Sequence, residues 1–127
     1  MKRTIFITLA ALLFAAAVCT ASNRIVTRVV DHARHLRTEA IEAMDGQDVQ
    51  RAEQTLVELA EYIAENQFWL EVFCEHEDLH DMKVQIIDAQ ASIDFGSRED
   101  FYQAIYRFGE ALEHIADVEQ IRLSNLY

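Results

Sequence analysis

The longest apolar run in the chain comes first: residues 4–21 carry no charge and directly follow Lys2 and Arg3. These eighteen residues would span about 27 Å as a helix, close to the thickness of the hydrocarbon core of a bilayer. We expect residues 1–23 to form a membrane anchor in which residues 4–21 contact lipid. Arg24, Arg28, Arg34 and Arg37 follow the run, so a bare count of basic residues favours the opposite orientation. Because a three-residue tail beside such a run normally stays in the cytoplasm, we nevertheless expect a single-pass protein of the cell membrane whose domain, residues 24–127, is extracytoplasmic.

The end of the apolar run leaves two alternatives to an uncleaved anchor. Cys19, Thr20 and Ala21 form a small-x-small sequence that a signal peptidase could cleave. Cys19 could also accept a lipid, although the preceding Val18 is larger than the residue usual at that place. An anchored, a secreted and a lipid-modified domain therefore all stay open from the sequence.

After Ala21 the pattern takes the period of an amphipathic helix. Apolar residues recur every three or four positions, and no helix breaker occurs before Asp45-Gly46. This stripe consists of Val26, Val29, Ala33, Leu36, Ala40 and Met44. We expect the anchor helix to continue outward to about Met44, with Gly46 as the left-handed residue that closes it.

Two further helical segments follow this turn. Asp48 is a suitable start for the first of them. Its stripe is Val49, Ala52, Leu56, Leu59 or Ala60, and Ile63. Near Asn66-Gln67 the phase of the pattern shifts, which predicts a turn or kink before a third helix. The stripe of that third helix is Trp69, Phe73, His76, Leu79, Met82, Ile86, Ala89 and Ile93.

The clearest boundary in the chain lies between residues 94 and 100. Gly96 ends one helix, and Ser97 with Asp100 three residues later resembles a capping box. A last helix therefore begins at Arg98. Its apolar face consists of Phe101, Ile105, Phe108, Leu112, Ile115 and Val118.

So tight a connection makes the third and last helices antiparallel. Residues whose numbers sum to about 192 then lie at one level, which places Trp69 beside Leu123 and His76 beside Ala116. Because the chain has no proline and only three glycines, helix formers dominate it. The predicted fold class is all-α: an N-terminal transmembrane helix that continues into an antiparallel bundle of three to four helices.

The domain behind the anchor is strongly acidic. All 22 acidic residues but only 9 of the 11 basic ones lie after Ala21, so residues 22–127 carry a formal charge of −13. Such a surface repels phosphate backbones, and we expect no nucleic acid among the partners. Four arginines lie close to the anchor, where we expect them to flank it and extend toward lipid headgroups. They are Arg24, Arg28, Arg34 and Arg37.

The sharpest chemical motif is His76-Glu77-x-x-His80, which matches the zinc metalloprotease pattern. Histidines four apart share one face of a helix and could bind zinc, while Glu77 could polarise a water molecule. Asp100 lies far enough downstream to serve as a third ligand. These residues are the candidates for a metal-binding protein or a metal-dependent hydrolase.

Three features argue against that alternative. Acidic Glu75, Asp78 and Asp81 lie where such proteases have uncharged residues. Moreover, the chain is short and offers no strand that could bind a substrate. We therefore expect no catalytic residue, no cofactor and no metal.

The aromatic residues that precede this motif are expected to lie in the core. Large aromatic side chains such as Phe68, Trp69 and Phe73 are more often packed than bound to a ligand. Cys74 is expected to behave as a small buried hydrophobe. Neither group predicts a binding site.

Several features of the chain match a known pattern. They are the basic start before one apolar segment, the spacing from Trp69 to His76, the pair His114-Ile115 and the ending Asn125-Leu126-Tyr127. In these features the chain resembles the bacterial domain-of-unknown-function family 4363, short membrane-anchored helical proteins of clostridial type, although the family ending has Ile and Phe in the last two places. The resemblance implies a tethered helical domain without assigned activity and an incidental protease match. It also suggests a polar contact of His76 with His114 that fixes the helix packing.

These observations predict a membrane-anchored, non-catalytic helical interaction or accessory protein. Its expected partner is another membrane protein or a second copy of the chain. The stripe from Val26 to Met44 separates two versions of this prediction. If the stripe packs on the other helices, the domain is a self-contained bundle, and if it is exposed, it is a seam for a partner.

Overall fold

The computed structural model describes residues 1–126, without the side chains of residues 122, 123, 125 and 126. Over this range the chain is almost wholly helical and contains no strand. The helices are α1 (Lys2–Asp45), α2 (Val49–Glu65), α3 (Gln67–Phe73), α4 (His76–Phe95) and α5 (Arg98–Leu126). The predicted all-α class is therefore confirmed.

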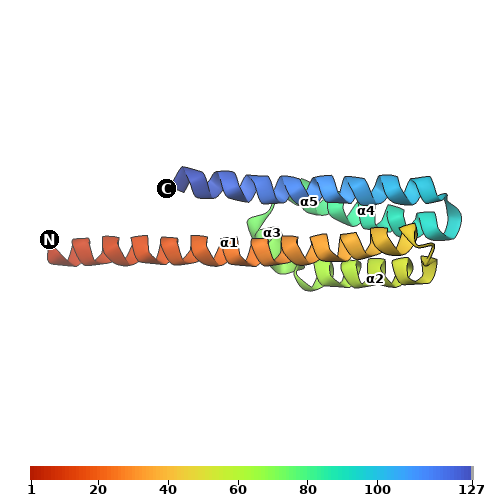
Figure 1. Cartoon of the computed structure of the whole chain (residues 1–127). Coiled ribbons are helices and arrows are strands. Elements are labelled where there is room, and N and C mark those ends of the chain that lie inside the picture. The colour runs from red at the N-terminus through yellow and green to blue at the C-terminus, as the bar shows by residue number, and fades with distance from the viewer. Residues whose placement is uncertain (127) are drawn as a thin grey trace.

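The four long helices form an up-down-up-down bundle (Figure 1). α1 packs against α2 and α5, and α4 packs against the same two helices, so every packed pair runs antiparallel. The N-terminal part of α1 projects far beyond the bundle, and α5 ends beside the place where α1 emerges from it. The short α3 crosses from α2 to α4 at that same end (Figure 1). We call this the anchor end of the bundle, and the opposite end the far end.

α1 combines the apolar run and the first helix of the bundle in one element of 44 residues. All side chains up to Val18 are exposed, and the first buried residues are Ser22 and Val26. From Val26 to Met44 the predicted stripe is no more than 6% exposed. The predicted continuation of the apolar N-terminal segment into the bundle as one helix is confirmed. The stripe packs inside the chain, so the domain is the self-contained version of the bundle.

Two clusters of buried side chains fill the bundle. The first includes Val26 of α1 and Leu70 of α3 and lies toward the anchor end. The second surrounds Ala40 and Phe101 and lies toward the far end. Phe101 and Phe108 of α5 are the largest fully buried side chains, and truncation of such a residue to alanine costs about 3–5 kcal/mol. The bundle thus has an apolar core that does not depend on the projecting part of α1.

The turn after α1 differs from the prediction. Gly46 has a φ of −81° and is not left-handed, whereas Gln47 has a φ of 62°. The backbone amide of Gln47 donates to the carbonyl of Met44 at 3.0 Å, and that of Asp48 donates to the carbonyl of Ala43 at 2.8 Å. The prediction for Gly46 was wrong because the chain reverses one residue later, after the buried Met44 has completed the last turn.

Both predicted helix starts are confirmed. The side chain of Asp48 accepts a hydrogen bond from the amide of Arg51 at 3.2 Å. At the start of α5 the bonds are reciprocal: the amide of Ser97 donates to Asp100 Oδ2, and the amide of Asp100 donates to Ser97 Oγ, both at 3.1 Å. These caps satisfy backbone donors that the first turn of a helix leaves without a partner.

The predicted third helix is in fact two helices. α3 ends at Phe73, and α4 begins at His76. Between them Cys74 and Glu75 are extended, with ψ values of 159° and 140°. The break is needed because α3 lies across the bundle while α4 runs along it. The antiparallel alignment of α4 with α5 therefore does not extend to Trp69 in α3. The side chain of its predicted neighbour, Leu123, lies outside the described part of the chain.

Candidate functional site

The metalloprotease-like motif lies on the surface at the start of α4. His76, Glu77 and His80 are all exposed. The predicted inward position of His76 was wrong, because the buried face of α4 begins with Asp78. Asp100 lies at the far end of the bundle, almost the whole length of α4 away. No group of three or more histidine, cysteine or acidic residues in the described chain is arranged to hold a metal ion.

A polar contact does join α4 and α5, but it involves Asp78 in place of His76. Nδ1 of His114 lies 2.9 Å from Oδ1 of Asp78. Asp78 is buried with 8% of its surface exposed, whereas His114 is exposed. The two residue numbers sum to 192, so the predicted level of the antiparallel pair is confirmed. The contact fixes the register of the two helices.

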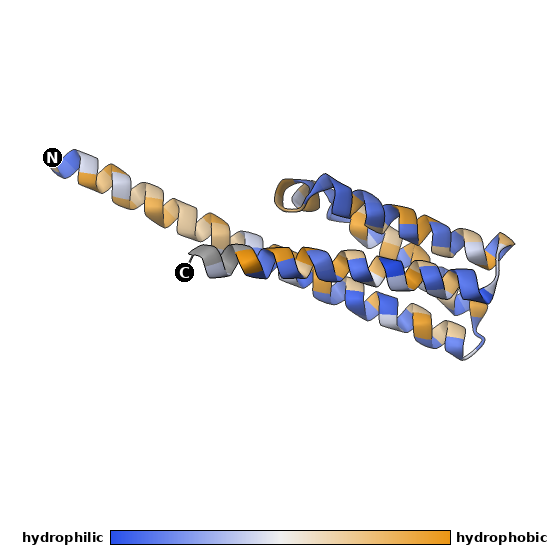
Figure 2. Ribbon diagram, turned by 90° about the horizontal axis from the view of Figure 1, so that it is seen from above, coloured by the Kyte–Doolittle hydropathy of each residue, from blue (hydrophilic) through white to orange (hydrophobic). Residues whose placement is uncertain are grey.

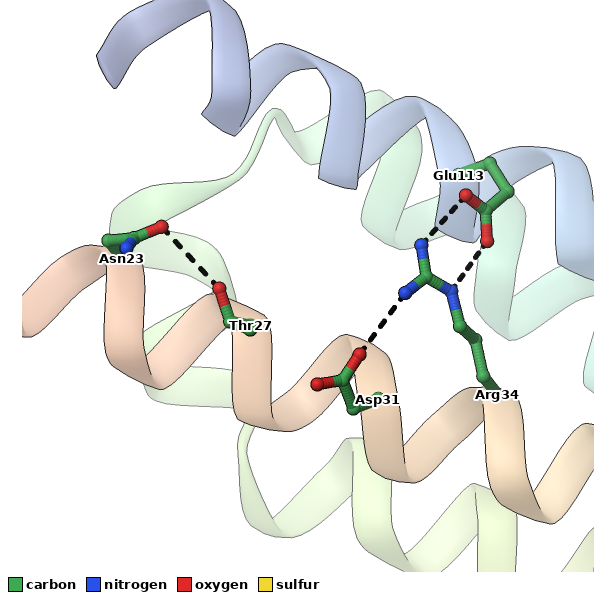
Figure 3. A network of polar contacts seen from close by, with 5 residues as sticks. All are labelled: Asn23, Thr27, Asp31, Arg34 and Glu113. Carbon is green, nitrogen blue, oxygen red and sulfur yellow. Dashed lines mark hydrogen bonds and ion pairs between the residues drawn. The ribbon is translucent and has the colours of Figure 1, made fainter.

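A groove of about 300 Å³ that polar side chains line lies between α1 and α5, in the half of the bundle near the anchor end. Figure 3 shows side chains from both helices in this groove. Its α1 wall includes Asn23, Thr27, Asp31 and Arg34, and its α5 wall includes Glu113, Asp117 and Gln120. Within α1, the hydroxyl of Thr27 donates to Oδ1 of Asn23 at 3.4 Å.

At one end of the groove, Arg34 and Glu113 form an ion pair between α1 and α5 (Figure 3). Nε and Nη2 of Arg34 donate to the two carboxylate oxygens of Glu113 at 2.6 and 2.8 Å, and Nη1 donates to Asp31 at 3.1 Å. The hydrogen bond from Arg34 lowers the pKa of the Glu113 carboxyl, and the same bond raises the pKa of Arg34. Arg34 is therefore charged and engaged by carboxylates of its own chain.

A second arginine crosses to α5 one turn further on. Nε of Arg37 donates to the backbone carbonyl of Ile105 at 3.0 Å, and its guanidinium lies 5.5 Å from the ring centre of Tyr106. A Cβ atom added at Gly109 would lie 2.6 Å from Nε of Arg37. Glycine at this place leaves the room through which the arginine reaches the backbone of α5.

The arginines near the anchor thus divide into two pairs. Arg24 and Arg28 are exposed, and their extension toward lipid headgroups stays a prediction. Arg34 and Arg37 instead bond to α5, so the expectation that they extend toward lipid headgroups was wrong. The sequence carried one signal of this packing, a glycine inside the helical pattern at position 109.

Closer to the anchor end, the same two helices share a buried contact. The hydroxyl of Ser22 donates to Oε1 of Glu119 at 3.2 Å, and both residues are less than one-tenth exposed. Together with the Arg34–Glu113 pair, this contact holds α5 against α1 along the groove. The groove is lined by carboxylates and one arginine, and its polar contacts join α1 to α5.

The aromatic residues before α4 also differ from the prediction. Phe68 is 65% exposed and Trp69 is 44% exposed, although both were expected in the core. Phe73 and Cys74 are partly buried and pack against the core. Because α3 lies across the bundle, only one of its faces is covered, and Leu70 occupies the central place on that face.

The projecting part of α1 is the other distinctive surface. By length and composition, α1 is the one described helix that could cross a membrane, and no residue of its apolar window is buried. Figure 2 shows this part as a mostly apolar rod, whereas the bundle alternates polar and apolar positions. A membrane span and a signal sequence both fit these properties.

A comparison with protein families matches residues 20–126 to a family described as a domain of unknown function, DUF4363. The match covers the whole bundle and leaves out residues 1–19. No curated protein and no solved structure matches the chain significantly.

Proposed function

The chain belongs to the DUF4363 family, and because the description of that family assigns no activity, we propose a function from the structure itself. The protein is a membrane-anchored, non-catalytic helical module that presents its bundle to a partner. Residues 4–21 cross the cell membrane once, and the bundle lies outside the cytoplasm. The partner is another membrane protein or a second copy of the chain.

The observation that carries this proposal is the exposed apolar window in the same helix that builds the bundle. Such a surface is stable in lipid and costly in water. The residue that follows the possible cleavage site, Ser22, is buried in a contact with Glu119 of α5. That contact favours retention of the segment over its removal.

The continuous helix also makes the tether stiff. Residues 22–45 contain no proline or glycine. These 24 residues place the far end of the bundle about 36 Å beyond the apolar segment. A partner that meets the far end, where Phe95 is 92% exposed, must therefore reach that height above the bilayer.

Several polar side chains of the bundle bind one another across helix pairs and serve packing. Arg34 and Glu113 bind each other, as do Asp78 and His114. The rival reading, a metal-dependent hydrolase, gains no support because its histidines are exposed and Asp100 lies at the other end of the bundle. This distribution supports a module that docks through its surface.

Fractionation of cells that express the full chain tests the anchor. We expect the protein in the carbonate-washed membrane fraction with the intact mass of all 127 residues. A soluble protein trimmed near Ala21, or a protein that carries a lipid on Cys19, would overturn the proposal. Leu12→Arg with Phe14→Arg should release the chain from the membrane fraction. The matched control, Gln103→Arg on the exposed surface of α5, should leave it there.

A further inference from the structure

α3 lies across the anchor end of the bundle (Figure 1). It contacts α1 as well as its two chain neighbours, and Leu70 belongs to the same buried cluster as Val26 of α1. Val26 lies five residues beyond Ala21, the last residue of the apolar segment, which corresponds to about 7.5 Å along the helix axis. α3 is therefore close to the level at which α1 leaves its apolar segment.

The face of α3 that points away from the core is apolar. Leu70 is 1% exposed, whereas Phe68 and Val72, two positions to either side of it, are 65% and 56% exposed. Residues two positions apart lie on opposite sides of a helix, so Phe68 and Val72 point away from the core. Trp69 adds a half-exposed ring that lies edge-on to Phe68, with 5.1 Å between the ring centres. This seven-residue helix thus presents three large apolar side chains outward.

We propose that α3 is an interfacial helix that lies in the headgroup region of the bilayer, with Phe68, Trp69 and Val72 in contact with lipid. The inference rests on the proposed function, because the anchor must hold the bundle with its anchor end against the membrane. A helix that crosses the bundle lies along the bilayer surface when α1 passes through the bilayer. Tryptophan is enriched at this depth, where its ring meets both acyl chains and headgroups.

The charges around α3 indicate which lipid chemistry it meets. Arg24 and Arg28 on α1 are exposed near this level and complement headgroup phosphates. Glu65 and Glu71 are also exposed, and Glu71 accepts a hydrogen bond from Gln67 at 2.8 Å. The opposite charges offset each other, so apolar contact supplies the affinity, and a zwitterionic bilayer is sufficient.

The single tryptophan of the chain reports on this contact without any substitution. The full chain is reconstituted in phosphatidylcholine vesicles that contain lipids with a nitroxide quencher at a shallow or a deep acyl position. We expect the shallow quencher to reduce Trp69 emission about twofold more than the deep one, since the ring lies near the headgroups. Iodide in the aqueous phase should quench it weakly.

Two variants in a Trp69→Phe background separate this inference from the proposed function. Phe14→Trp places the reporter in the middle of the apolar segment, where the deep quencher should act most strongly. Phe95→Trp places it at the far end, where iodide should quench and neither lipid should. If Phe14→Trp responds as expected but Trp69 is quenched by iodide and not by lipid, only the α3 inference fails.

The remaining outcomes are equally decisive. If neither iodide nor lipid quenches Trp69, another protein surface or a second copy covers α3, and the inference is wrong. If Phe14→Trp is not quenched by lipid either, the anchor itself fails, and the α3 inference falls with it. Preferential shallow quenching of Trp69 supports the contact with the bilayer.

Discussion

Arg34 of α1 and Glu113 of α5 form a bidentate ion pair, although 79 positions separate them in the sequence. Both carboxylate oxygens of Glu113 accept hydrogen bonds from the guanidinium, at 2.6 and 2.8 Å. The pair joins the last helix to the helix that continues into the projecting apolar segment. It therefore contributes to the register between α5 and the emerging part of α1. A planar guanidinium suits this geometry better than a lysine would.

Removal of either partner should weaken the bundle only slightly. Arg34 and Glu113 side chains are 43% and 53% exposed, so water and salt screen the pair. We expect Arg34→Ala or Glu113→Gln to lower the free energy of unfolding by about 0.5–1 kcal/mol, and the double variant to cost less than the sum. Denaturant unfolding of the full chain in mild detergent measures this. Fully additive losses would show that the two side chains do not interact.

The same pair predicts a pH dependence. The pKa of Glu113 is lowered in the folded state, so its contribution is present above the pKa of the unfolded chain and is lost as the pH falls through the folded value. The stability difference between the wild type and Glu113→Gln should therefore be constant near neutral pH and shrink below about pH 4. A difference that stays unchanged at pH 2–3 would contradict this explanation.

The effect of Gly109→Ala on stability should depend on whether Arg37 is present. Alanine gains about 1 kcal/mol of helix propensity over glycine, but its Cβ would lie 2.6 Å from Nε of Arg37 and displace the guanidinium from Ile105. In the wild type the lost hydrogen bond should cancel this gain. In an Arg37→Ala background, Gly109→Ala should stabilise the bundle by about 0.5–1 kcal/mol. Equal effects in both backgrounds, measured by thermal unfolding, would exclude the steric conflict.

Loss of the Asp78–His114 contact should affect the stability of the bundle more than loss of the exposed histidines His76 and His80. Asp78→Ala should destabilise the bundle by about 1–2 kcal/mol, because it removes a buried acceptor and leaves His114 without this contact. His76→Ala and His80→Ala alter exposed side chains and should change stability by less than about 0.5 kcal/mol. We also expect no stoichiometric zinc in the purified full chain by elemental analysis. Zinc that is present in the wild type and lost in His80→Ala would instead support the hydrolase reading.

Periodicity and caps made much of this fold predictable. The stripe from Val26 to Met44 has the period of one helix, and it is buried throughout. The bonded pair Ser97 and Asp100 was visible as a local pattern, and the tight turn before it determined the level at which α4 and α5 meet. These features depend on residues close together in sequence, where the physical rules are local.

The features that were missed depend on distant parts of the chain. The corner at Cys74 contains no glycine or proline, and it exists because the chain must cross from α2 to α4. Hydrophobicity alone did not show that Trp69 lies outside the core, since lipid and core favour the same side chains. The partner of Arg34 could not be chosen from sequence because many carboxylates share the helix faces.

The proposed function depends on an anchor that holds the bundle outside the cytoplasm. Labelling with a membrane-impermeant maleimide on cells that express the chain tests this topology. Two single-cysteine variants are compared, Lys2→Cys and the exposed Gln103→Cys, each in a Cys19→Ala, Cys74→Ala background. We expect label at position 103 in intact cells and at position 2 only after permeabilisation. Protection of position 103 until permeabilisation, or label at position 2 in intact cells, would contradict the proposed function.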